Sequence, residues 1–244
     1  MKIDPLYILP NLFTGASIYL GILSVSYATM GKFHLACWLV LLSLIFDGLD
    51  GRVARLTGTT SKFGVEFDSL ADVVAFGVAP AMILFCYVGY MYGKLGIIVS
   101  GLYVVFGAIR LARFNVTTTQ NEPNVFIGLP IPAAAVFVVS WLLLEMGFLQ
   151  NYLENSKAIS QFLLIGSLIV ALLMVSNIRY PSFKKLNFEK ISFVRAIVLL
   201  MIILAILFAY PVLSIVTLIT CYVLFGPIRA LYYLLKKKIV EKKK

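Results

Sequence analysis

The strongest constraint on this chain is a series of long apolar segments separated by polar turns. Eight such segments lie near residues 12–30, 34–54, 66–92, 95–114, 132–149, 159–177, 194–209 and 212–234. Most of them reach the roughly 20 apolar residues that a helix needs to cross a bilayer. Hydrophobic residues make up 61% of the chain and charged residues 13%, and the mean hydropathy is +0.97. These values exclude a soluble enzyme, a disordered chain and a secreted disulfide scaffold. The sequence therefore predicts an all-α integral membrane protein with about eight transmembrane helices.

The distribution of basic residues predicts how these helices are oriented. With eight spans, 18 of the 21 Lys and Arg residues fall on one side, and only Lys32, Lys94 and Lys157 fall on the other. The richer side is cytoplasmic by the positive-inside rule, and an even number of spans puts both termini there. Six spans plus a helical hairpin is the alternative. The net charge of +10 is thus assigned to cytoplasmic loops and anionic headgroups, and no nucleic-acid partner is expected.

The same pattern divides the chain into four segments. Residues 1–11, interrupted by Pro5 and Pro10, are predicted to form an N-terminal interfacial segment. Residues 12–180 form a transmembrane core, and residues 181–235 form additional C-terminal transmembrane helices. Residues 236–244 are a basic cytoplasmic tail on the headgroup surface.

Acidic residues are scarce, and nearly half of them gather in one place. Five of the eleven lie within 26 residues: Asp47, Asp50, Glu66, Asp68 and Asp72. Asp47 and Asp50 are three residues apart, and Asp68 and Asp72 are four apart, so each pair shares one face of a helix. The short polar turn 56–63 makes the second and third spans antiparallel neighbours. We therefore expect the two aspartate pairs to face each other just inside the cytoplasmic interface.

Four carboxylates at one depth near a membrane repel one another and are costly to desolvate. Hard divalent ions such as Mg²⁺ prefer carboxylate oxygens, and two ions about 3.5–4 Å apart suit in-line attack at phosphorus. Three other interpretations are protonation of some acids, structural ion pairs with Arg52, Arg55 and Lys62, and a cation pathway in a transporter. Against the transporter, basic residues interleave with the acids, and the acids lie at one depth.

Small and basic residues surround the acids. Gly51 and Ala54 share the helix face of the first aspartate pair, and Gly64 opens the third span, so a bulky ligand can approach the backbone. Arg55, one turn beyond Gly51, offers a forked donor to a phosphate. Two metals, a phosphate-binding arginine and room for a base together suit a nucleotide diphosphate.

These residues form a single spaced pattern, Asp47-x-x-Asp50-Gly51-x-x-Ala54-Arg55, eight residues, then Gly64-x-x-x-Asp68-x-x-x-Asp72. It resembles the signature of the CDP-alcohol phosphotransferases at all eight fixed positions and in every spacing. The segment from Pro10 to Thr14 also resembles the start of the family's first helix. The resemblance implies a six-helix core over most of residues 8–180, followed here by two C-terminal helices.

The resemblance also implies roles for individual residues. Asp47, Asp50, Asp68 and Asp72 would hold two divalent metal ions, Mg²⁺ or Mn²⁺, which bridge the diphosphate of a CDP-linked lipid. Asp72 would be the general base for the acceptor hydroxyl, which attacks the lipid-side phosphorus and releases CMP. The CDP-lipid, CDP-diacylglycerol or CDP-archaeol, would contact Asn11, Thr14, Asp50, Gly51, Ala54, Arg55, Lys62 and Gly64. A homodimer in the cytoplasmic membrane, with its active site near the cytoplasmic face, is likewise implied.

A second, less specific motif bears on the acceptor alcohol. Arg110-Leu-Ala-Arg113-Phe-Asn115, followed by Gly128-Leu-Pro-Ile-Pro132, resembles the phosphatidylserine synthase branch of the family. Arg110 and Arg113 share a helix face and would bind the carboxylate of L-serine, and Asn115 would orient it. The predicted reaction is transfer of a phosphatidyl or archaetidyl group to L-serine. Snorkelling of both arginines to the interface and a different acceptor, glycerol 3-phosphate or an inositol phosphate, are the alternatives.

Overall fold

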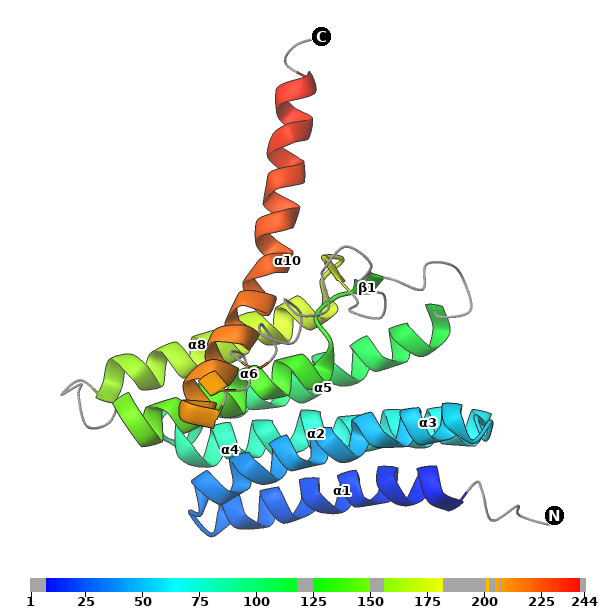
Figure 1. Ribbon diagram of the computed structural model, residues 1–244. Coiled ribbons are helices and arrows are strands. Elements are labelled where there is room, and N and C mark those ends of the chain that lie inside the picture. The colour runs from blue at the N-terminus through cyan, green and yellow to red at the C-terminus, as the bar shows by residue number, and fades with distance from the viewer. Residues whose placement is uncertain are drawn as a thin grey trace.

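The computed structural model describes residues 8–117, 125–149, 156–181, 201, 205–206 and 208–241. The N-terminal half is a bundle of helices that run back and forth along one direction (Figure 1). Its third crossing consists of an α-helix, a π-helical segment and a second α-helix without a break. The elements are α1 (Ile8–Thr29), α2 (Phe33–Leu56), α3 (Lys62–Asp72), η2 (Val73–Val78), α4 (Ala79–Tyr87), η3 (Gly89–Tyr92) and α5 (Lys94–Thr117).

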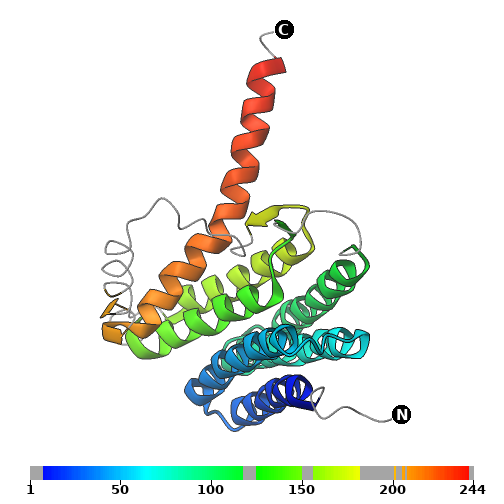
Figure 2. The same cartoon turned by 45° about the vertical axis from the view of Figure 1, so that its right-hand side comes forward.

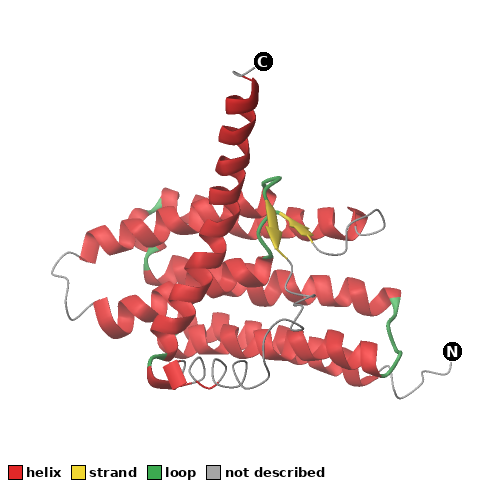
Figure 3. Cartoon of the chain, turned by 45° about the horizontal axis from the view of Figure 1, so that its top comes forward, coloured by secondary structure: helices red, strands yellow, loops and turns green. Residues whose placement is uncertain are grey.

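The C-terminal half adds more helices and a small sheet. Strands β1 and β2 pair antiparallel, with Phe126 opposite Tyr180, and they lie at one end of the bundle (Figure 3). These strands were not predicted, because three residues each are too few to show a period in the sequence. The elements are β1 (Val125–Ile127), α6 (Ile131–Leu144), η4 (Glu145–Leu149), α8 (Ser156–Val175), β2 (Arg179–Pro181) and α10 (Pro211–Glu241).

The helical membrane architecture is confirmed, and six helices are long and apolar enough to cross a bilayer. A shorter apolar helix covers Ile131–Gly147, within the predicted fifth span. Most of the predicted span 194–209 lies outside the described residues. The number eight therefore stays a prediction. The six are Ile8–Thr29, Phe33–Leu56, Lys62–Tyr87, Lys94–Val116, Lys157–Val175 and Pro211–Tyr233.

Helix α1 begins at Ile8, four residues before the predicted start of the first span. Pro10 lies in its first turn, where proline is tolerated because backbone N–H groups have no intrahelical partner there. The helix therefore includes Asn11 and Thr14 near its beginning, and the buried side of this turn contains Pro10 and Thr14.

Small residues allow α1 to pack closely against its neighbours. Ser17, Gly21, Ser24 and Ala28 recur at helical spacing on its buried face. A Cβ on Gly21 would lie 2.9 Å from Cα of Ala75 in η2, so a larger residue would force the helices apart. The resulting close contact of α1 with α2, α3 and η2 holds the first three crossings together around the aspartates.

The long helix α10 has two parts with different surroundings. Its N-terminal part packs against α6, where Trp141 Nε1 donates to Thr220 Oγ1 over 3.0 Å. Its C-terminal part projects away from the bundle (Figures 1 and 2). Pro227 lies inside the helix, where it removes a backbone N–H donor. The first described residues of the predicted basic tail, starting at Lys236, belong to this helix.

Candidate active site

The two aspartate pairs face each other, as the spacing predicted. One oxygen each of Asp47 and Asp50 on α2 and of Asp68 on α3 all lie within 4.8 Å of one another. Asp72 lies beside Asp47 and Asp68, and its Oδ1 is buried with no hydrogen-bond partner among the described residues. The four carboxylates thus form one cluster between α2 and α3.

Helix α1 fixes the position of Asp50, which is only 5% exposed. Thr14 Oγ1 donates to Asp50 Oδ2 over 2.6 Å, and the backbone N–H of Gly51 donates to Oδ1. Both carboxylate oxygens are therefore held, which keeps the side chain in one orientation. Thr14 is 36 residues from Asp50, so no local pattern indicates this hydrogen bond. In the sequence, only the resemblance of the first helix to that of the family pointed to Thr14 as a site residue.

The turn between α2 and α3 is built by small and hydroxyl residues. Gly58 has a φ of +67°, which glycine adopts without strain, and reverses the chain after α2. Thr57 and Thr59 hydroxyls form a 2.7 Å hydrogen bond. Ser61 caps α3 by accepting from the N–H of Gly64 over 3.0 Å. This turn directs the start of α3 back toward α1 and α2.

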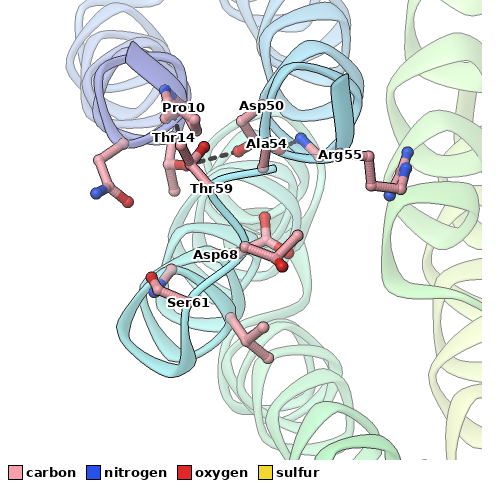
Figure 4. Close-up of a pocket in the computed structure, with 13 residues that line it drawn as sticks. Pro10, Thr14, Asp50, Ala54, Arg55, Thr59, Ser61 and Asp68 are labelled. Atoms are coloured by element: carbon pink, nitrogen blue, oxygen red, sulfur yellow. Dashed lines mark hydrogen bonds between the residues drawn. The ribbon is translucent and has the colours of Figure 1, made fainter. Parts of the chain in front are cut away.

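A cavity of about 180 Å³ opens beside the aspartates, and Figure 4 shows Asp50 and Asp68 on its walls. Seven of the eight residues predicted to contact the CDP-lipid line it; Lys62 does not and is exposed. Sequence reasoning missed five lining residues, although the polar turn 56–63 was a signal for three of them. The lining comprises Pro10, Asn11, Thr14, Asp50, Gly51, Ala54, Arg55, Thr59, Thr60, Ser61, Gly64, Val65 and Asp68.

Two glycines keep the walls of this cavity close to the backbone. A Cβ on Gly64 would lie 3.2 Å from Ser61 Oγ and 3.8 Å from Asn11 Oδ1. A Cβ on Gly51 would lie 3.4 Å from Arg55 Nη1. Side chains at either position would occupy space in the cavity beside these polar groups.

Arg110 on α5 is a buried basic residue whose charge acts on the aspartate cluster. It is 6% exposed, and its charge interacts with Asp72 on α3 and with Tyr222 on α10. The Phe114 ring lies 5.4 Å from its guanidinium carbon, within the range of a cation–π interaction. Arg110 Nε is buried without a hydrogen-bond partner among the described residues, so it retains a donor for a ligand.

Arg113 is engaged differently from Arg110, although both were predicted to bind serine. Its Nη1 and Nη2 donate to four backbone carbonyls and one side-chain amide, and these hydrogen bonds hold α5 to the last residue of β1 and to the end of α8. These donors of Arg113 are occupied by main-chain and amide oxygens, although its charge lies close enough to act on that of Arg110. The acceptors, at 3.0–3.3 Å, are the carbonyls of Ile127, Met174, Val175 and Ser176, and Asn177 Oδ1.

Asn115 connects two helices near the site. Its Nδ2 donates to Ser69 Oγ over 2.9 Å, and Glu66 Oε2 is 3.5 Å away. Ser69 follows Asp68 directly on α3, so this contact positions the helix that carries two of the aspartates. Glu66 itself is exposed and stands outside the cluster, as its register predicted.

Helix α10 packs against Tyr180 of β2, and this contact brings α10 close to the site. The Tyr180 ring fills the space beside Gly226, where an added Cβ would lie 2.4 Å from the ring, and its hydroxyl donates to Val223 O over 3.2 Å. Burial, and to a smaller extent Tyr222, raises the pKa of Tyr180 to about 12, so the phenol stays a donor. This contact places Tyr222 beside Arg110, which nothing in the sequence indicated.

The donor set of the aspartate cluster fits hard divalent cations. The group consists only of carboxylates, which Mg²⁺ and Mn²⁺ prefer to the His and Cys ligands typical of zinc. The unpaired, buried Asp72 Oδ1 would gain a partner from such an ion. The side chains present therefore fit the metal that the sequence predicted.

Comparisons with known proteins agree with this geometry. Residues 7–226 match the model of the CDP-alcohol phosphatidyltransferase family. The chain is 51% identical to a CDP-diacylglycerol–serine O-phosphatidyltransferase of Helicobacter pylori over 236 residues, 97% of this chain and 96% of that protein. It is 42% identical to an archaetidylserine synthase of Methanothermobacter thermautotrophicus over 183 residues, 74% of this chain and 72% of that protein.

A solved structure shares the fold. The crystal structure of a phosphatidylinositol phosphate synthase from Mycobacterium tuberculosis, with CDP-DAG bound, matches 70% of this chain and 80% of that one. The TM-score is 0.50 at 19% identity. With the aspartate signature assembled on α2 and α3, and with a family match over nearly the whole chain, this protein belongs to the CDP-alcohol phosphatidyltransferase family.

Proposed function

We propose that this protein transfers the phosphatidyl or archaetidyl group of CDP-diacylglycerol or CDP-archaeol to the hydroxyl of L-serine, with CMP as the second product. The observation that carries the proposal is a buried arginine, Arg110, whose charge acts on Asp72 in the aspartate cluster and whose Nε has no hydrogen-bond partner in the part of the chain that the structure describes. The names of the Helicobacter and Methanothermobacter relatives support serine as the acceptor.

The metal-binding residues are Asp47, Asp50, Asp68 and Asp72, which would hold two Mg²⁺ or Mn²⁺ ions. Bound ions would neutralise charge on the diphosphate as it develops in the transition state. Thr14 and the Gly51 N–H orient Asp50, so one metal-binding carboxylate is fixed before the substrate arrives. Such preorganisation lowers the reorganisation cost of the reaction.

The cavity beside the aspartates is the proposed binding site for the CDP-lipid head. Gly51, Ala54 and Gly64 expose the backbone to the nucleotide, and Asn11 supplies a polar side chain on α1. Arg55 would donate to a phosphate oxygen at the exposed edge of the cavity. Lys62, which is exposed and outside the lining, would attract the anionic substrate through solvent.

Asp72 is the proposed general base. The serine hydroxyl would give its proton to Asp72, its oxygen would form a bond to the lipid-side phosphorus, and the bond to the CMP oxygen would break. Arg110 would hold the serine carboxylate by a charge-assisted hydrogen bond. We assign Arg113 and Asn115 to positioning, because Arg113 holds the end of α8 and Asn115 holds α3.

Activity with different alcohols tests the proposed acceptor. We expect the purified protein to release CMP from CDP-diacylglycerol with L-serine and to release little with glycerol 3-phosphate or an inositol phosphate. Both alternative acceptors bring a second phosphate, and the one buried cation that faces Asp72 among the described residues is Arg110. CMP is quantified by chromatography, and turnover with glycerol 3-phosphate but not with L-serine would overturn the assignment.

Substitution of Arg110 tests the carboxylate contact. A hydrogen bond to a charged group contributes about 1.5–3 kcal/mol, so Arg110→Gln should raise the KM for L-serine about 10- to 100-fold. The KM for CDP-diacylglycerol should change less than about threefold. Arg52→Gln is the matched control, because Arg52 is exposed and outside the cavity lining. Equal changes in both KM values would show that Arg110 does not recognise the acceptor.

We also propose the topology that the basic residues predict. Both termini and the active site would lie on the cytoplasmic side, with eight spans in all. The six candidate spans and the shorter helix at Ile131–Gly147 support this, as does the apolar segment 194–209. The proposed segments remain 1–11 at the interface, 12–180 as the core, 181–235 as additional helices and 236–244 as the tail. A homodimer, implied by the family resemblance, completes the proposal.

A further inference from the structure

A second cavity lies at the end of the bundle opposite the aspartates, and its volume of about 560 Å³ exceeds that of the catalytic cavity. Phe33 on its wall is the first residue of α2, and Tyr87 is the last residue of α4. Phe33 and Asp47 are 14 residues apart, about 21 Å along a helix axis. Because transmembrane helices end at the membrane surface, this cavity lies at the interface on the other side of the membrane.

A buried acid lies in the wall of this cavity. Glu145, at the start of the π-helical segment η4, is 7% exposed. The Tyr87 hydroxyl donates a hydrogen bond to Oε2 of Glu145. An acid at the end of an apolar helix is costly without a cation, and π-helical turns are frequent at functional sites.

Aromatic side chains surround the acid. Phe33, Tyr87, Tyr90 and Tyr92 line the cavity together with Glu145, and the Phe33 and Tyr87 rings meet edge to face with centroids 5.0 Å apart. Aromatic faces attract ammonium groups, and carboxylate and phenol oxygens accept hydrogen bonds from a primary ammonium. This wall therefore has the chemistry of a cation site.

Helix α8 contributes a positive charge to the lining of the cavity. Lys157, in the first turn of α8, lines the cavity with Ser160 and Gln161. Lysine binds phosphate as a point charge, and the two polar side chains add hydrogen-bonding groups. The lining of the cavity thus combines an acid, aromatic rings, a lysine and two polar side chains.

We propose that this cavity binds the headgroup of a zwitterionic phospholipid from the leaflet opposite the active site. The ammonium group would contact Glu145 and the aromatic rings, and the phosphate would contact Lys157. The acyl chains would run along the exposed apolar surface of the adjoining spans. The volume lies in the range of about 300–1,000 Å³ that is typical of small-molecule sites. A lipid is favoured over a soluble ligand because the cavity opens where headgroups surround the protein.

Lipid binding is tested on the full-length protein in detergent. Phosphatidylethanolamine and phosphatidylglycerol with identical acyl chains are titrated, and the unfolding temperature and the bound lipids, detected by native mass spectrometry, are followed. We expect phosphatidylethanolamine to bind and to raise Tm, and to do so at least about tenfold more tightly than phosphatidylglycerol. Glu145→Gln should remove this preference, and Lys157→Gln should weaken both lipids.

Two further variants keep the test decisive. Tyr90→Leu changes a lining residue that is 59% exposed, so it should weaken phosphatidylethanolamine binding even if Glu145→Gln fails to fold. Lys94→Gln, at the same end but outside the cavity lining, should change nothing. Equal binding of the two lipids, or unaltered selectivity in Glu145→Gln and Tyr90→Leu, would overturn the proposal. CMP release is measured in parallel and should persist in all four variants, which separates this test from that of the catalytic site.

Discussion

Replacement of Asp72 by Asn is expected to reduce CMP release by about 10³-fold or more and to change the affinity for CDP-diacylglycerol by less than about tenfold. The amide has the shape of the carboxylate but does not take up the proton of the acceptor hydroxyl. Asp47, Asp50 and Asp68, whose oxygens lie within 4.8 Å of one another, remain to bind the substrate complex. Single-turnover CMP release and equilibrium binding of a labelled CDP-lipid measure the two effects separately.

Glu66→Gln is the matched control for this substitution. Glu66 is an exposed carboxylate on the same helix, outside the catalytic cavity lining, so its removal should leave turnover within about twofold. Asp72→Glu keeps a base and should retain part of the activity. Turnover at the wild-type rate in Asp72→Asn would refute the assignment of the base. Loss of cation flux in liposomes, with CMP release intact, would instead support a transporter.

Removal of divalent cations is the second change with a large expected effect. Chelation with EDTA should abolish CMP release with every alcohol, and Mg²⁺ or Mn²⁺ should restore it. Among the described residues, the one buried Lys or Arg is Arg110, and a single positive charge is too little to neutralise four adjacent carboxylates and a diphosphate. Activity after chelation and after stepwise addition of each metal measures the effect.

Metal binding has a readout that does not depend on catalysis. An ion that binds only the folded protein stabilises it by about 2.7 kcal/mol at 100 times its Kd, so Mg²⁺ or Mn²⁺ should raise Tm. The shift should shrink in Asp68→Asn, which removes one carboxylate of the cluster, and should persist in Glu66→Gln. An unchanged Tm in the wild type, together with activity that survives EDTA, would contradict the metal-binding role of the aspartates.

The candidate site was predicted in large part because its residues are close in the sequence. The intervals of three and four residues in Asp47–Asp50 and Asp68–Asp72 follow the helix period, and the short turn between them forces the two helices to be neighbours. The same locality explains why Gly51 and Gly64 were predicted to border the ligand. The lining residues Thr59 to Ser61 were missed because a polar turn has no side-chain periodicity to indicate which way each residue points.

The residues predicted to bind serine show that a local sequence pattern does not predict which partners a side chain contacts. Arg110 and Arg113 lie three residues apart on one face of α5 and are equivalent by sequence. In the structure, Arg110 interacts with Asp72 and Tyr222, whereas Arg113 donates to carbonyls at the end of α8, 62 residues away. The direction in which each side chain extends depends on α8, β1 and α10, whose positions are set by packing.

Hydropathy and helical periodicity are properties of neighbouring residues, so the helical membrane architecture and the composition of the aspartate cluster could be predicted from the sequence alone. Packing between distant segments sets the other features: Thr14 orients Asp50, Arg113 supports the end of α8, and α10 brings Tyr222 beside Arg110. The same packing brings Glu145 and Lys157 into one cavity. These arrangements join segments that are distant in the chain, and their geometry follows from how closely the helices pack.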